Sequence, residues 1–431
     1  MNEVTVIGGG LAGCEAAWAL AERGFEVRLY EMKPKKFTPA HHYEGLAELV
    51  CSNSLKASRI NSACGMLKAE MRILGSLILE AADNAAVPAG GALAVNRERF
   101  SDYVTAKIKA HENITLVEEE ATDFPRSNTV IATGPLTSDA FAGEIQKHCG
   151  NTLSFYDAAA PIVSADSIDM SKAFFATRYD KGEADYINCP MNKEQYEAFY
   201  AELVSAETVP LKEFETLTVY EGCMPVEVLA KRGAKSLCYG CMKPVGLIDP
   251  NTGHRPWAAV QLRKENIEGS AYNLVGFQTN LKFPEQQRVF RMIPGLENAE
   301  FLRYGVMHRN TFLNSPLILN NRFMLKESNG VYFAGQMTGV EGYIESAMSG
   351  IVAGQSLARR LNGQERLYLP KTTMCGALCS YVAAENADFQ PMGANMGILP
   401  PLEEHIRDKQ DRYLKIAERG LADMREAVGS F

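Results

Sequence analysis

The chain begins with a pattern of apolar residues that predicts a strand, a helix and a second strand. The β-branched run Val4–Ile7 is typical of a buried parallel strand, and Cys14–Arg23 carries apolar residues at helical spacing. Val27–Tyr30 predicts the next strand. The three elements form a β-α-β unit of about 30 residues.

Apolar periodicity further along the chain predicts more strands and helices. Ala63–Asp83 carries Leu67, Met71, Leu74 and Ile78 at helical spacing, which predicts a helix with a buried face. The other segments with a clear pattern are strands at Ile114–Val117, Thr129–Ile131 and Asn329–Phe333, and helices after Leu93–Phe100, at Met337–Leu361 and at Leu402–Ala417.

From about Asn151 the pattern changes to short mixed segments, with aromatic-rich stretches and no second glycine fingerprint. This change predicts an inserted domain. The expected fold class is therefore α/β, with a Rossmann-like domain formed by residues 1–150 and 305–431 and an inserted α+β domain, residues 151–304.

Glycines follow the first predicted strand in the pattern of a dinucleotide-binding loop. Gly8 permits a tight turn, Gly10 lets the backbone approach a pyrophosphate, and Gly13 lets helix and strand pack closely. The helix N-terminus presents unpaired N–H groups to the phosphates, and Glu31 follows the second strand at the distance expected for a ribose contact. The unit indicates an ADP-containing dinucleotide, and its place near the N-terminus favours FAD over NAD by analogy.

Two later strand ends are expected to contact the same cofactor. Ala132-Thr133-Gly134 follows one strand and Gly335-Gln336 follows another, before a helix whose N-terminus points at the flavin. The complete set of expected cofactor-binding residues is Gly8, Gly9, Gly10, Leu11, Ala12, Gly13, Glu31, Gly134, Gly335 and Gln336.

Composition places the chain among ordinary soluble globular proteins. Its 431 residues are 46% hydrophobic and 22% charged, and no apolar run approaches the roughly 18 residues of a membrane span. We therefore expect a cytoplasmic protein without a membrane partner. The ten cysteines are scattered and follow no secretory signal, which favours free thiols.

The net charge of −8 argues against a protein that coats nucleic acid non-specifically. Charge is uneven, however, because residues 228–309 contain twelve Lys and Arg against six Asp and Glu. This excess is either an ordinary solvated face or a local RNA-docking surface.

Three cysteine environments carry candidate chemistry. Cys51 lies in a loop of small polar residues and is either a buried spacer or a reactive thiol in a cofactor cleft. Cys223 follows Gly222 and lies two residues before Pro225. Gly222 frees the turn and Pro225 favours an extended Met224, so Cys223 is expected at a bend. Cys238 and Cys241 form a CxxC pair without a second pair or nearby His residues at zinc spacing, so no metal site is expected.

Several long motifs resemble the TrmFO family of folate- and FAD-dependent tRNA (uracil-5-)-methyltransferases, which is related to the GidA-type flavoproteins. The resemblance covers nearly the whole chain. The motifs that carry it are GGGLAGCEAAW, LVCSNSLK, EGCMPVE, MKPVGL, GFQTNLKFPEQQRVFRMIPGLENAEFLRYGVMHRNTF and VYFAGQMTGVEGYIESAMSG.

The resemblance implies that residues 1–150 and 305–431 form the FAD-binding domain and that the inserted domain, residues 151–304, binds substrate and RNA. It also implies a reaction and a set of site residues. 5,10-Methylenetetrahydrofolate supplies a one-carbon unit to C5 of a T-loop uridine in tRNA, reduced FAD supplies electrons, and NADH or NADPH recharges the flavin. Cys223 matches the family's nucleophile and Cys51 its second functional cysteine, although either assignment of nucleophile and base stays open. His308 matches the residue expected to stack on the folate pterin.

Other functions remain as alternatives at this point. The same chemistry on ribosomal RNA is the nearest alternative, since nothing in the sequence separates the two RNAs. A flavin disulfide oxidoreductase using Cys238 and Cys241 would usually carry a second glycine motif, which is not found. A non-catalytic RNA-binding flavoprotein is the third. The oligomeric state and the choice between NADH and NADPH cannot be read from the sequence.

Overall fold

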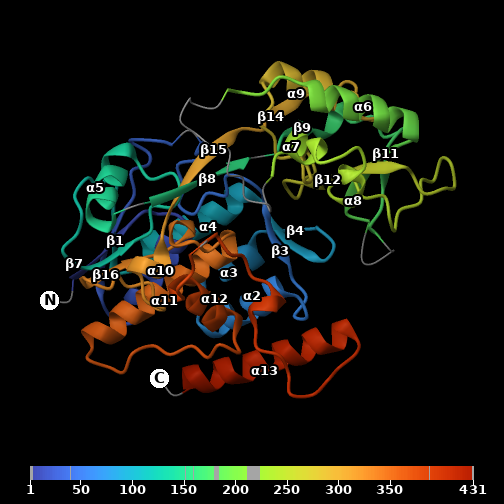
Figure 1. Ribbon diagram of the computed structural model, residues 1–431. Helices are drawn as coiled ribbons and strands as arrows, with labels where there is room; N and C mark the ends of the chain where they lie inside the picture. Colours follow the sequence, from blue (N-terminus) through green and yellow to red (C-terminus); the bar gives the residue numbers. More distant parts are fainter. Residues whose placement is uncertain are drawn as a thin grey trace.

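The computed structural model describes residues 3–38, 40–150, 152–158, 160–178, 184–210, 224–387 and 389–429, with the backbone alone for 152–158 and 307–311. It consists of two parts built on two sheets (Figure 1). We call them the parallel-sheet part and the antiparallel-sheet part.

The parallel-sheet part is built on five parallel strands, with β1 in the centre. Val6 of β1 lies beside Leu29 of β2 on one side and Val130 of β7 on the other. All three side chains are buried. In spatial order the strands are β16 (Asn329–Phe333), β7 (Ser127–Ile131), β1 (Glu3–Ile7), β2 (Glu26–Tyr30) and β6 (Ile114–Val117). This is the doubly wound, Rossmann-like arrangement expected from the sequence, and the expected α/β class is confirmed.

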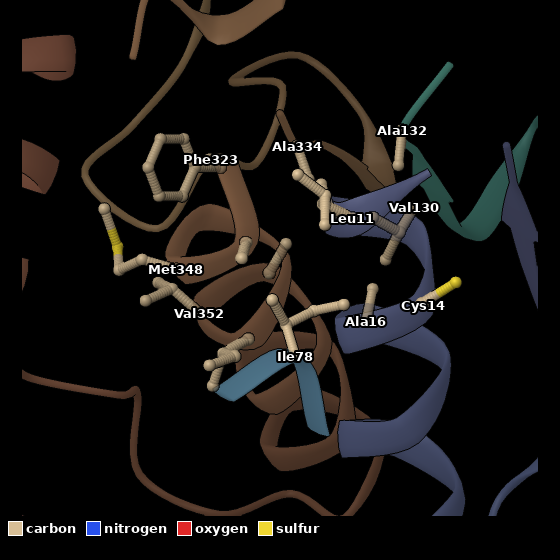
Figure 2. Packing of buried hydrophobic residues seen from close by; sticks show 14 of the residues in the cluster. Leu11, Cys14, Ala16, Ile78, Val130, Ala132, Phe323, Ala334, Met348 and Val352 are labelled. Carbon is tan, nitrogen blue, oxygen red and sulfur yellow. The ribbon is translucent and has the colours of Figure 1, made fainter. Parts of the chain in front are cut away.

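Two helices beside this sheet pack closely against each other, because the glycine and alanine residues at their contact leave no large side chain between them. A Cβ added to Gly350 of α11 (Tyr343–Leu361) would lie 2.1 Å from Ala12 O of α1 (Leu11–Ala21), and one on Gly354 would lie 2.8 Å from Ala16 O. Figure 2 shows Leu11 and Ala16 of α1 beside α11, whereas Met348 and Val352 lie on the side of α11 that faces away from α1. The two helices and the sheet share one hydrophobic core.

The remaining elements of the parallel-sheet part surround this core. The helices are α2 (Ala63–Ile73), α3 (Leu77–Asn84), α4 (Arg97–Ala110), α5 (Asp139–Cys149), α10 (Ser315–Ile318), α12 (Met374–Ala383) and α13 (Lys409–Gly429). A small antiparallel sheet has the order β3 (Ser54–Ala57), β5 (Ala92–Val95) and β4 (Ala86–Val87).

The antiparallel-sheet part has six strands and its own hydrophobic core. In spatial order the strands are β10 (Phe174–Phe175), β11 (Tyr186–Met191), β12 (Ala258–Lys264), β13 (Ala271–Leu274), β9 (Ile162–Ser164) and β14 (Phe301–Arg303). Its helices are α6 (Lys193–Ser205), α7 (Val226–Lys231), α8 (Ser236–Tyr239) and α9 (Phe283–Phe290). The exact domain limits at 151 and 304 stay a prediction.

The two parts are joined by a two-stranded ribbon. β8 (Thr152–Ala158) leaves the parallel-sheet part, β15 (Met307–Leu313) returns to it, and the two strands pair antiparallel over seven residue pairs. Figure 1 shows this ribbon between the two sheets.

Three predicted helices have different limits in the structure. The stretch predicted as one helix, Ala63–Asp83, is two helices, because Gly75 adopts a φ of +80° and Ser76 Oγ accepts a hydrogen bond from Leu79 N at the start of α3. The helix expected from Met337 begins only at Tyr343. Gly339 and Gly342, with φ of +82° and +119°, occupy the turn before it.

The C-terminal helix lies later than predicted. It was expected at Leu402–Ala417 and is observed at Lys409–Gly429. Asp408 Oδ1 accepts hydrogen bonds from Gln410 N and Asp411 N, at 2.8 and 2.9 Å, and so satisfies donors of its first turn. The charged pattern extends beyond the helix, but the cap decides where the helix starts.

Candidate dinucleotide site and cysteine loop

A cleft opens at the carboxyl ends of the parallel strands, where such folds bind ligands. It collects residues from the ends of β1, β2, β7 and β16. Nine of the ten expected cofactor-binding residues line it: Gly8, Gly9, Gly10, Leu11, Ala12, Glu31, Gly134, Gly335 and Gln336. Gly13 lies beneath the loop and contributes packing.

The glycine loop after β1 is shaped by close backbone contacts. Gly8 has a φ of +104°, and a Cβ there would lie 2.5 Å from Ala132 O. A Cβ on Gly13 would lie 1.7 Å from Gly8 O. Gly10 is different, because a Cβ there would meet no heavy atom within 4 Å. Gly10 is also the residue before α1, so the unpaired N–H groups of that helix face the open cleft.

Glu31 ties the end of β2 to the glycine loop. Its Oε2 accepts a hydrogen bond from Gly9 N at 2.8 Å, and its Oε1 accepts one from Lys33 N at 2.9 Å. A Cβ on Gly9 would lie 2.8 Å from Glu31 Oε2, so glycine is needed for this approach. The carboxylate lies in the cleft, where the sequence predicts a ribose contact.

The opposite wall of the cleft comes from the ends of β7 and β16. Gly134 has a φ of +71°, and Thr137 Oγ1 donates a hydrogen bond to its carbonyl oxygen at 2.8 Å. Gly335 has a φ of +87°, and its N–H donates to Ser349 Oγ of α11 at 2.7 Å. Gln336 Nε2 donates to Glu341 Oε2 at 2.6 Å. Both strand ends therefore reach the same cleft from separate parts of the sequence.

Several lining residues were not singled out from the sequence: Lys33, Thr38, His41, Glu48, Thr137 and Tyr343. Lys33 is 5% exposed and donates from Nζ to Tyr43 O and Gly45 O, at 2.9 and 2.6 Å. Burial lowers the pKa of His41 below its ordinary value, and the Lys33 ammonium acts in the same direction. The Lys- and Pro-rich composition of this loop gave no sign that it folds over the cleft.

The loop that carries Cys51 lies beside this cleft. Its neighbour Val50 lines the cleft, and Cys51 N and Ser52 N both donate to Tyr343 Oη, at 2.8 and 3.1 Å. Tyr343 is the first residue of α11, and burial raises the pKa of its phenol. The helix start predicted to face the flavin thus also holds the cysteine loop.

Two predicted site residues have no described side chain. Cys223 lies outside the described residues, and the chain is described again from Met224, just before α7. The backbone of His308 lies on β15 opposite Asp157 of β8. Their proposed roles stay predictions.

The CxxC pair lies in the antiparallel-sheet part, and neither cysteine lines the cleft. Cys238 and Cys241 form no disulfide. Burial raises the pKa of both thiols, that of Cys241 to about 12. Their position and thiol form give no support to a redox pair that works beside a dinucleotide.

Two kinds of site are not found among the residues that the structure describes. No group of three or more His, Cys, Asp or Glu side chains is placed to hold a metal ion. No helix in those ranges has the length and hydropathy needed to cross a membrane.

A Rossmann-like sheet with a glycine loop facing a cleft, and an acidic residue at the end of the second strand, defines a dinucleotide-binding protein. Comparison with known proteins identifies the family of the chain. The model of the family described as glucose inhibited division protein A (GidA) matches residues 3–365. The chain belongs to the GidA family and, with the relatives below, to its TrmFO group.

Two relatives illustrate the similarity. A protein of Acetivibrio thermocellus, called methylenetetrahydrofolate--tRNA-(uracil-5-)-methyltransferase TrmFO, is 57% identical over 438 residues, 100% of both chains. A protein of the same name from Listeria monocytogenes serotype 4b is 58% identical over 422 residues, 97% of both chains. Among solved structures, GidA of Aquifex aeolicus matches with a TM-score of 0.71 and 17% identity over 99% of this chain and 75% of that one. That likeness establishes the shared fold.

Proposed function

We propose that this chain is an enzyme that transfers a one-carbon unit from 5,10-methylenetetrahydrofolate to C5 of a uracil in tRNA and yields 5-methyluridine. The observation that carries the proposal is the 57% identity, over the full length of both chains, to a relative that bears the name of this activity. The motifs described in the sequence analysis imply the same activity. The reaction is proposed to take place in the cytoplasm.

The cleft fits FAD in the places where a dinucleotide needs room. Open space at Gly10 before α1 suits a pyrophosphate, and Glu31 lies where a ribose hydroxyl is expected. Gly335 and Gln336 line the same cleft at the end of β16, where the sequence predicts a contact with the flavin. When bound, FAD would supply the electrons that convert the transferred methylene group to methyl, with NADH or NADPH as the reductant.

The chemistry at uracil needs a nucleophile. Uracil C5 is a weak nucleophile until a thiolate adds at C6 and makes the C4–C5 bond an enolate that can attack the methylene carbon. We assign this thiolate to Cys223 and a supporting role in the same reaction to Cys51, with His308 against the folate pterin. Cys51 lies beside the cleft, as such a role requires.

The direct test is a methylation assay. The purified chain is incubated with methylenetetrahydrofolate, NADH or NADPH and a tRNA transcript, and the digested RNA is analysed for 5-methyluridine. We expect product with tRNA in the presence of all components. Product only with a ribosomal RNA transcript would mean that ribosomal RNA, and not tRNA, is the substrate. No product with either RNA would refute the proposal.

The nucleophile is tested separately with RNA that carries 5-fluorouridine. Fluorine at C5 cannot leave as a proton does, so the chain should form an adduct that survives denaturation, and Cys223→Ala should lose both the adduct and methyl transfer. Cys238→Ala is the matched control and should keep substantial activity. An inactive Cys238→Ala together with an active Cys223→Ala would favour the redox-pair alternative.

A further inference from the structure

Three arginines from three elements converge on the Cys51 loop, which we define as residues 49–53. Arg97 is the first residue of α4, Arg263 lies on β12 and Arg303 is the last residue of β14. We call them the arginine cluster. Two of its members therefore belong to the antiparallel-sheet part, whereas the loop belongs to the other part.

The arginine cluster binds the loop on both sides of Cys51. Before the cysteine it donates to two backbone carbonyls, and after it to two side-chain oxygens. The bonds run from Arg97 Nη1 to Leu49 O at 2.8 Å, from Arg303 Nη2 to Val50 O, from Arg263 Nη2 to Ser52 Oγ at 2.8 Å, and from Arg263 Nε to Asn53 Oδ1 at 2.9 Å.

Positive charge in this cluster exceeds the negative charge that the described residues bring to it. Glu265 Oε2 lies 2.9 Å from Arg97 Nε, and the two side chains are 8% and 16% exposed. One carboxylate against three guanidinium groups leaves two positive charges. Arg97 Nη2 is also buried and has no hydrogen-bond partner within the described ranges. A buried excess of cations favours an anion beside it.

The Cys51 thiol is the group placed to supply negative charge. Burial lowers the pKa of Arg263 and of Arg303. Acidic groups nearby oppose this shift: Glu265 acts most strongly on Arg263 and Tyr343 on Arg303, and Cys51 contributes at both arginines. Tyr343, on α11 beside the loop, is also ionisable, but burial raises the pKa of its phenol and keeps it neutral. Its oxygen accepts the two backbone N–H groups of residues 51 and 52.

We propose that the arginine cluster holds Cys51 as a thiolate at neutral pH, and that Arg97, Arg263 and Arg303 are positioning residues for this sulfur. A thiolate, and not a thiol, can attack carbon or accept a proton, so the cluster sets the reactive form of Cys51. The inference deepens the proposed function, which gives Cys51 a part in the reaction. The ionisation of the sulfur does not depend on methyl transfer and can be measured without it.

The test is the pH dependence of Cys51 alkylation in the full-length chain. Protein is treated briefly with iodoacetamide between pH 5 and 10, and the modified Cys51 peptide is quantified by mass spectrometry, with Cys51→Ser as the blank. We expect a midpoint below the ordinary thiol value of about 8.5. Arg303→Gln should raise that midpoint by about one pH unit and slow alkylation at neutral pH about tenfold.

A second substitution separates charge from hydrogen bonding. Gln at position 303 keeps an N–H donor for Val50 O but loses the charge, whereas Arg303→Lys keeps the charge. The lysine variant should therefore retain the low midpoint. Arg291→Gln is the matched control, because Arg291 also donates to a backbone carbonyl, Ala299 O at 2.9 Å, on another part of the surface. It should leave the midpoint unchanged.

Two results would overturn the inference: a wild-type midpoint at or above about 8.5, or equal shifts in Arg303→Gln and Arg303→Lys. If Arg303→Gln fails to fold, as judged by thermal unfolding, Arg97→Gln and Arg97→Lys give the same comparison. A low midpoint with no methylation of either RNA would refute the proposed function alone. Methylation with an ordinary midpoint would refute the thiolate alone.

Discussion

Gly10 is the glycine of the loop with open space at its Cα. Its neighbours Gly8 and Gly13 are enclosed by backbone atoms, and a side chain on either would disturb the fold itself. A side chain on Gly10 would meet no heavy atom of the chain within 4 Å and would occupy space in the cleft. A change at Gly10 therefore tests ligand binding apart from folding.

We expect Gly10→Val to purify as a folded protein without FAD, because the added side chain takes the place of a phosphate. Flavin absorbance after purification and the midpoint of thermal unfolding measure the two effects. Gly143→Val is the control, since Gly143 of α5 also has no heavy atom within 4 Å of an added Cβ. A Gly10→Val protein with full flavin occupancy would contradict the assignment of the cleft.

At the scale of elements, the contact between α1 and α11 depends on glycine. The added Cβ of Gly350 would lie 2.1 Å from the backbone oxygen of Ala12, which no side-chain motion can relieve. The helices would have to separate, and α1 presents its N-terminus to the cleft.

Gly350→Ala should therefore destabilise the protein by about 1–3 kcal/mol and weaken FAD binding at the same time. Denaturant unfolding and flavin titration measure the two effects. Gly143→Ala, at an open position inside α5, should leave FAD binding unchanged and should not destabilise the protein. Unchanged stability in Gly350→Ala would mean that the two helices pack less closely than described.

Two helices of the parallel-sheet part begin at buried glutamates from other helices. Glu15 of α1 accepts N–H groups of Leu77 and Ile78 at the start of α3, and Glu70 of α2 accepts those of Met374 and Cys375 at the start of α12. Burial raises the pKa of each carboxyl from 4.5 to about 7.

A raised carboxyl pKa has a definite consequence for stability. The folded state binds the proton more tightly than the unfolded state, so this contribution to stability is present at low pH and is lost as pH rises from about 4.5 to 7. Glu70→Gln keeps one acceptor but has no titration. We expect it to destabilise by about 1–3 kcal/mol at pH 5 and by less at pH 8.

The measurement is the free energy of unfolding of wild type and variant at both pH values. Glu98→Gln is a suitable control, because Glu98 is exposed on the first turn of α4. If the loss of unfolding free energy in Glu70→Gln were larger at pH 8 than at pH 5, the ionised carboxylate would be the form that the folded state favours.

The sequence predicted elements well where the pattern is local and poorly where a distant contact decides. The β-α-β unit and the glycine loop follow from residues adjacent in sequence. The break at Gly75 depends on backbone conformation, and the start of α13 depends on the Asp408 cap. Both are single-residue signals inside otherwise continuous helical patterns.

The same distinction applies to the site. Nine predicted residues line the cleft because the glycine motif and strand ends identify it. Lys33, His41 and Tyr343 were missed, since they reach the cleft only when separate segments meet. Arg97 gave no signal in the sequence at all, because its role depends on the position of Cys51 and Glu265.

For the whole molecule, the basic excess of residues 228–309 divides into buried and exposed charge. Arg263 belongs to this excess, but it is 7% exposed and lies under the Cys51 loop, so it is not part of any exposed basic face. Exposed basic residues remain near Trp257, which is 39% exposed. The ammonium groups of Lys193 and Lys235 lie 5.8 and 6.0 Å from its ring centroid, and Arg255 is exposed two residues before it.

An aromatic ring between cations suits stacking with a nucleobase beside a phosphate backbone. We expect Trp257→Ala to weaken tRNA binding by about 1–3 kcal/mol. Arg255→Glu should weaken it and reduce its dependence on salt, with FAD retained in both variants. Filter binding at several salt concentrations gives these values.

The control for this surface is Arg425→Glu. Arg425 is exposed on α13, which lies on the opposite side of the molecule in Figure 1. It should leave RNA affinity almost unchanged. Equal losses of RNA affinity in Arg255→Glu and Arg425→Glu would indicate a general charge effect. Unchanged affinity in both Arg255→Glu and Trp257→Ala would mean that the RNA binds to another surface.

Within the described ranges, the chain passes between the two sheets through the ribbon of β8 and β15, whose strands run side by side. Such a ribbon can act as a hinge, because bending its strands together keeps their mutual hydrogen bonds. Arg263 and Arg303 would swing with the antiparallel-sheet part, while Arg97 would stay with Cys51. One outward swing would thus remove two of the three cations from the sulfur, so the thiolate would be lost when the two parts separate and restored when they come together.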